Sequence, residues 1–129
     1  MRAGVVVSIF LFASAAAQAQ SIDFSGKWSV SGNLASGGGM MIIAPVCDLK
    51  QAGDQIAGPC KGPNGSCSAA GVVNGADIDM TCRTTSTNQQ NLAGFSTFHG
   101  TLGGDNIVRG TWAHSRFPGA SGRFTMMRA

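Results

Sequence analysis

The sequence contains no tyrosine and no glutamate, and only 12% of its 129 residues are charged. Strong helix formers are therefore scarce, and the 19 glycines would destabilise any helix that contained them. The composition accordingly favours an all-β protein. Nine basic and six acidic residues leave a net charge of +3, which is too weak to indicate binding to nucleic acid.

The residues that usually carry catalysis are also few. The chain has two histidines, His99 and His114, and its serines do not occur in the G-x-S-x-G pattern of a nucleophile elbow. Asp77 and Asp79 would share the polar face of one strand, where exposure to solvent explains them without an acid–base or cation-binding role. We therefore expect no enzymatic activity, no catalytic residues and no cofactor.

The N-terminus has the three parts of a secretory signal peptide. Arg2 precedes a mostly apolar run at residues 5–12, and Ala17-Gln18-Ala19 provides small residues at a cleavage site. The apolar run is too short to span a bilayer. The sequence predicts a signal peptide at residues 1–19, a single domain at 20–129 and a periplasmic or secreted protein that is not inserted in the membrane after cleavage.

The four cysteines have two possible uses in such a chain. Zinc bound by four thiolates is one of them, but zinc sites usually contain C-x2-C pairs, whereas Cys60 and Cys67 are seven positions apart. Two disulfides are the usual outcome in an exported protein. We expect disulfides and no metal.

Two hairpins determine which cysteines pair. Asn74-Gly75 is typical of a type I′ turn, and folding the chain about it places two cysteines opposite each other. Folding about Gly53-Asp54 does the same for the other two. The sequence therefore predicts the bridges Cys47–Cys60 and Cys67–Cys82.

The remaining segments alternate apolar and polar residues with the period of a β-strand. A third hairpin, with a loop at residues 104–106, aligns Phe98 with Trp112. Pro45 suggests a break or bulge in its strand. An eight-stranded antiparallel up-and-down β-barrel would leave no exposed edge, and a β-sandwich is the alternative. The predicted strands are residues 22–34, 40–51, 55–60, 66–73, 76–83, 93–103, 107–113 and 119–128.

The connections between these strands differ in length. The three turns named above are tight, whereas ASGGG, KGPNG, RTTSTNQQN and AHSRFP are longer and would lie together at the other end of the barrel. Binding residues are often carried on long loops, although each of these side chains also has a simpler explanation as a solvated rim residue. The candidate ligand-binding residues at this mouth are Trp112, Phe98, Arg116, His114, Phe117, Arg83 and Lys61.

Two motifs resemble those of the calycins, the superfamily of lipocalins, fatty-acid-binding proteins and avidins. Gly26-Lys27-Trp28 matches the G-x-W signature of the first strand, and residues 98–112, FHGTLGGDNIVRGTW, are similar to an avidin hairpin. The resemblance implies a small-ligand barrel. It does not imply biotin binding, because Val30 and Leu34 stand where avidins have polar ligand-binding residues, and the tyrosines are missing.

The expected function is that of an exported, non-catalytic binding protein with a small, partly apolar ligand at the long-loop mouth. The alternative is a periplasmic inhibitor or protein-interaction module, since the chain also resembles small bacterial barrels that inhibit proteases or lysozyme. A structural role in the cell envelope is a third hypothesis. The expected partners are thus a small molecule or a periplasmic or extracellular protein.

Overall fold

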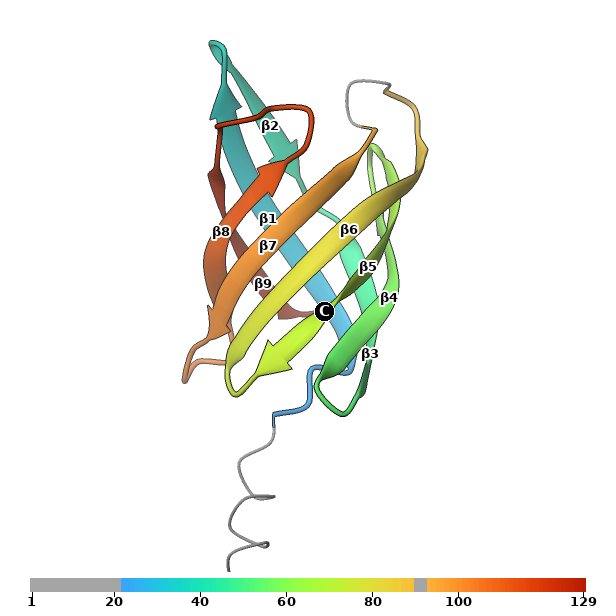
Figure 1. Ribbon diagram of the computed structural model, residues 1–129, viewed down its shortest axis with the longest axis vertical. Helices are drawn as coiled ribbons and strands as arrows, with labels where there is room; N and C mark the ends of the chain where they lie inside the picture. Colours follow the sequence, from blue (N-terminus) through green and yellow to red (C-terminus); the bar gives the residue numbers. More distant parts are fainter. Residues whose placement is uncertain (1–21, 90–92) are drawn as a thin grey trace, which may run out of the picture.

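The computed structural model describes residues 22–89 and 93–129, which form a single antiparallel β-barrel (Figure 1). The predicted signal peptide lies outside the described residues. No helix in the part of the chain that the structure describes is long and apolar enough to cross a membrane. The strands are β1 (Gly26–Ser36), β2 (Gly39–Ile43), β3 (Val46–Ala52), β4 (Gln55–Gly62), β5 (Gly65–Asn74), β6 (Asp77–Thr87), β7 (Phe95–Leu102), β8 (Val108–His114) and β9 (Gly122–Arg128).

The barrel closes through the pairing of β1 with β9. β2 and β3 lie along β1 in one continuous register, with Ile43 opposite Gly32 and Cys47 opposite Trp28. They are therefore two halves of one strand that is interrupted at Ala44-Pro45. The break at Pro45 is expected, because proline has no N–H with which to donate a hydrogen bond to the neighbouring strand. Nine segments thus make the predicted eight-stranded barrel, and its closure excludes the sandwich.

Two of the three predicted hairpin registers are confirmed. Cys47 lies opposite Cys60 across β3 and β4, and their sulfur atoms form a disulfide. Phe98 lies opposite Trp112 across β7 and β8. Asn106, in the loop of that hairpin, has a positive φ of 64°, a conformation that asparagine adopts more readily than most residues.

The third register is wrong by two residues, although the predicted bridge is correct. Asn74 pairs with Asp77, so the two-residue loop is Gly75-Ala76, and only Gly75 has a positive φ, of 61°. A glycine in the first loop position is typical of a type II′ turn rather than type I′. Cys82 therefore lies opposite Ala69, and its disulfide with Cys67 runs diagonally between the strands over a Cα–Cα distance of 5.5 Å.

The predicted segregation of connection lengths is only partly correct. β1 and β2 are joined by a tight turn at Gly37-Gly38, and β4 and β5 by another at Pro63-Asn64. The segments ASGGG and KGPNG thus belong mostly to strands. The longer connections at this end run from β6 to β7 and, at residues 115–121, from β8 to β9, and the β1–β2 and β4–β5 hairpins complete the mouth (Figure 1).

The opposite end of the barrel is closed by the segment that precedes β1. Phe24 is fully buried, and its carbonyl oxygen accepts a hydrogen bond from Nε1 of Trp28 at 2.9 Å. The guanidinium of Arg128 lies over the Trp28 ring, 4.2 Å from its centre, and donates to the carbonyl oxygens of Ser25 and Asp23. These contacts leave the mouth as the end at which the interior can open.

Candidate functional site

A cavity of about 110 Å³ lies inside the barrel on the side of the mouth. One part of its wall is formed by β2 and β3, which contribute Met41, Ile43 and Cys47. The opposite part is formed by β6 and β7, including Met80 and Phe98. Inward-facing residues alternate along each strand, so that one face of the sheet supplies this mostly apolar lining.

A row of polar groups lines the cavity toward the mouth. Their side chains offer hydroxyl and amide groups that can donate and accept hydrogen bonds. Apart from His114, none of the described lining residues is ionisable in the folded, disulfide-bonded chain. The polar lining residues are Asn64, Ser66, Thr84, Ser86, Thr87, Ser96 and His114.

His114 is the one buried polar or charged residue among those that the structure describes, with 7% of its surface exposed. Its Nδ1 accepts a hydrogen bond from the backbone N–H of Arg116 at 3.1 Å, which places the proton of the neutral ring on Nε2. The ring also contacts Phe117, with centroids 5.7 Å apart. The 115–121 connection therefore holds this imidazole at the cavity.

A second hollow, of about 300 Å³, continues the cavity over the rim. The two share Met41 and Asn64 in their walls, so they meet where β2 approaches the β4–β5 turn. Phe117 lines this outer groove opposite the β1–β2 hairpin. The cavity and the groove together reach the size of ordinary small-molecule sites, which begin at about 300 Å³.

Three of the predicted ligand-binding residues lie at this site. Phe98 and His114 line the cavity, and Phe117 lines the groove. Trp112 lines neither, because it stacks on Phe98 with centroids 5.9 Å apart and its Nε1 donates to the carbonyl oxygen of Asn33. Trp112 therefore packs against Phe98, which forms part of the cavity wall, without lining the cavity itself.

The predicted basic residues lie elsewhere. Lys61 and Arg83 are exposed on the outer surface of the barrel, where the Arg83 guanidinium covers the Phe95 ring at 5.1 Å. Arg116 is exposed on the 115–121 connection, and its Nε donates to the carbonyl oxygen of Ala93. The structure therefore brings none of the three into the described lining.

The hydroxyl-bearing residues of β6 are functional candidates that the sequence reasoning missed. The sequence predicts a long connection at residues 83–91, whereas β6 continues to Thr87. The run Thr84-Thr85 indicates β-strand, because threonine is enriched in strands. That signal predicts a longer strand that reaches the mouth.

Among the described residues, His114 is the one ionisable side chain that lines the cavity, and the other histidine lies elsewhere. Nδ1 of His99 contacts Oδ1 of Asp79, but both residues are exposed on the outer face of β6 and β7, and neither lines the cavity. All four cysteines are in disulfides, so the chain as described offers no thiolate ligand for a metal. The two disulfides indicate a non-reducing compartment.

Comparison of the chain with protein-family models and with curated proteins finds no match in either.

Proposed function

We propose that the protein binds a small, uncharged and mostly apolar molecule in the barrel cavity. The observation that carries this proposal is the cavity at the mouth, apolar in its depth and bordered by hydroxyl groups. Small-molecule sites commonly combine apolar walls with a few polar groups that orient the ligand. His114 is the one ionisable side chain among the described lining residues, so most of the lining offers no charge to pair with an ionic ligand.

The size of the cavity restricts the part of a ligand that it can hold. A cavity needs about 10–15 Å³ to hold a single water, and an apolar cavity of about 150 Å³ binds benzene. The 110 Å³ interior therefore suits one small ring or a short branched chain. The remainder of a larger ligand would lie in the groove between β2 and Phe117.

We assign this role to a periplasmic or secreted protein without catalytic activity. The disulfides support an oxidising compartment, and the predicted signal peptide supplies the route. The resemblance to calycins, whose barrels hold small ligands, agrees with the proposal and stays a prediction.

Benzene is a suitable first probe of the cavity. We expect the methyl NMR signals of Met41 and Met80, which line the cavity, to shift and saturate as benzene is added. The methyl of Met127, which is 48% exposed and lines neither the cavity nor the groove, serves as an internal control. Native mass spectrometry of the protein from its own cell envelope should detect a bound small molecule in parallel.

A matched pair of variants links binding to the cavity. Ser96→Leu fills the space beside His114 and is expected to weaken benzene binding by at least about tenfold, the effect of 1.4 kcal/mol. Ser68→Leu adds the same side chain on the exposed face of β5 and should leave benzene binding unchanged. Equal effects of the two variants, or shifts confined to Met127, would rule out this site.

A second function, that of a protein-interaction module, is favoured by the edge of β2. In the part of the chain that the structure describes, β2 pairs with β1 alone. The Val30 N–H donates to the Pro45 carbonyl oxygen, so these two residues form a hydrogen-bonded pair. In an antiparallel ladder, hydrogen-bonded and non-hydrogen-bonded pairs alternate along the strand. The N–H and C=O groups of Met40 and Ile42 therefore point away from β1. Both side chains are exposed, at 65% and 64%.

An extended, uncharged segment of a partner protein fits this edge. Added strands bind through main-chain hydrogen bonds, and no charged residue occurs from residue 28 to 47 to oppose an apolar strand. Charged residues are the usual protection of an exposed edge. The absence of charged residues from this hairpin supports the binding of a partner strand at the β2 edge.

A capped peptide of alternating valine and threonine tests this second function. It should slow amide hydrogen exchange at Met40 and Ile42, and Ile42→Lys should weaken its binding by at least about tenfold. Val72→Lys is the control, because Val72 is similarly exposed on β5, which is paired on both sides. Protection at other sites, or none at millimolar peptide, would contradict the interaction.

A further inference from the structure

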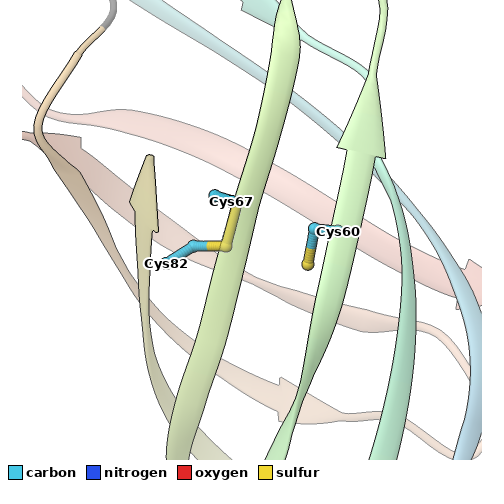
Figure 2. A group of neighbouring side chains, drawn as sticks. All are labelled: Cys60, Cys67 and Cys82. Carbon is cyan, nitrogen blue, oxygen red and sulfur yellow. A yellow bond between two sulfur atoms is a disulfide. The ribbon is translucent and has the colours of Figure 1, made fainter. Parts of the chain in front are cut away.

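The two disulfides lie side by side on one wall of the barrel. Their cysteines come from four consecutive strands, β3 to β6. Cys60 of the first bridge lies directly opposite Cys67 of the second, across β4 and β5. Figure 2 shows the Cys67–Cys82 bridge with Cys60 on the neighbouring strand.

Three of the sulfur atoms form a compact group. The Sγ atoms of Cys60, Cys67 and Cys82 all lie within 4.8 Å of one another. A thiolate formed at any of them is therefore beside a sulfur of the other bridge. Thiol–disulfide exchange requires that kind of approach, because a thiolate must attack one sulfur of a disulfide.

The two bridges differ in their access to solvent. Cys67 is half-buried and lines the cavity, whereas Cys60 is 1% exposed and is not among the lining residues. Cys47 and Cys82 also line the cavity, but they are only 1% and 4% exposed, so Cys67 presents the most exposed surface to a small thiol that enters it. Cys60 does not line the cavity, so its sulfur is approached from the neighbouring sulfur atoms of Cys67 and Cys82.

We propose that this wall is a thiol–disulfide exchange site in which Cys67 changes its partner from Cys82 to Cys60. The substrate is a small thiol or dithiol reductant. Its thiolate attacks Sγ of Cys67 and forms a mixed disulfide, and Cys82 leaves as a thiolate. A second thiol of the reductant attacks the reductant's own sulfur, which releases the oxidised reductant and the Cys67 thiolate.

The second exchange is internal. The Cys67 thiolate attacks Sγ of Cys60, the Cys60–Cys67 bond forms, the Cys47–Cys60 bond breaks and Cys47 leaves as a thiolate that takes up a proton. The net change is the transfer of two electrons from the reductant. The chain then holds a Cys60–Cys67 bridge and two reduced residues, Cys47 and Cys82.

Strand geometry selects this product over a bridge between Cys60 and Cys82. Directly opposed residues of antiparallel strands have Cα atoms about 4.5–5.5 Å apart, which suits a disulfide. Cys60 and Cys82 belong to β4 and β6, which are separated by β5. Two strand spacings come to about 9.6 Å, beyond the reach of a disulfide.

Limited reduction of the folded protein tests the exchange. One equivalent of dithiothreitol is added, the thiols are alkylated at once, and the protein is cleaved at its lysines, arginines and aspartates, which separates the four cysteines. We expect a two-electron-reduced species with a Cys60–Cys67 bridge and alkyl groups on Cys47 and Cys82. Reduced species that retain either original bridge, without any Cys60–Cys67 product, would refute the site.

Two single substitutions test the same step without a reductant. Both Cys82→Ser and Cys67→Ser remove the second bridge and leave one thiol. In Cys82→Ser the thiol at Cys67 is opposite Cys60 and can exchange into the Cys47–Cys60 bridge. At least about a tenth of the molecules should therefore carry their free thiol on Cys47 after equilibration at neutral pH.

In Cys67→Ser the thiol at Cys82 has no partner that it can bridge, so Cys47 should stay unlabelled. A thiol confined to Cys67 in Cys82→Ser, or equal labelling of Cys47 in both variants, would overturn the proposal. If either variant fails to fold, the limited reduction of the unmodified chain decides the question.

Discussion

Replacing Gly110 by alanine is expected to destabilise the barrel by about 3 kcal/mol or more. A Cβ atom at this position would lie 1.8 Å from the carbonyl oxygen of His99 and 2.6 Å from Cα of Gly100. Both atoms belong to the backbone of β7, which pairs with β8 along its length. Neither can move without separating the two strands, so urea unfolding should show a much lower midpoint.

Gly104 in the same hairpin provides the matched control. A Cβ atom there meets no atom within 4 Å, and its φ lies outside the left-handed region. Gly104→Ala should therefore be neutral or stabilise by about 0.4–1 kcal/mol, because alanine restricts the unfolded chain. Similar unfolding midpoints for the two variants would show that β7 and β8 are not packed as described.

Removal of either disulfide is the other large effect that we expect. The bridges join residues 13 and 15 positions apart, and the chain-entropy model assigns about 3 kcal/mol to each loop of this size. A domain of about 110 residues has only about 5–15 kcal/mol of stability in total. The double variant Cys67→Ala/Cys82→Ala should therefore lose a large share of its free energy of unfolding.

Cys47→Ala/Cys60→Ala is expected to lose more, because both residues are 1% exposed and their removal leaves a cavity as well as a longer unfolded loop. Chemical denaturation of the two double variants beside the unmodified protein measures both losses. A loss below about 1 kcal/mol for either variant would mean that the barrel strands hold the hairpin without its bridge.

The cysteine pairing was predictable even where the register was not. The Cys67–Cys82 hairpin is offset by two residues because its turn is centred on Gly75-Ala76. Two residues is the period with which side chains alternate on a strand, so the offset leaves the side chains that remain in β5 and β6 on their predicted faces. Hydrophobic alternation identifies faces, and it cannot distinguish registers that differ by two.

The candidate site was predictable only in part, for a different reason. The alternation predicts that Phe98 and Trp112 both face inward, but it does not indicate which of the two lines the cavity. The structure decides this through the stacking of Trp112 behind Phe98 and its bond to Asn33. Cavities depend on how side chains from several strands fill a shared interior, and no local pattern records that.

The pairing of β1 with β9 determines when the barrel can be completed. These are the first and last strands of the described chain, and Trp28 meets Arg128 across them. A chain made from its N-terminus forms its hairpins early, since their partners are close in sequence and loop closure costs little entropy. Until β9 emerges, the nascent protein is an open sheet with two unpaired borders, the stage at which such sheets associate with one another. The synthesis of β9 thus ends the period in which the barrel is at greatest risk of aggregation.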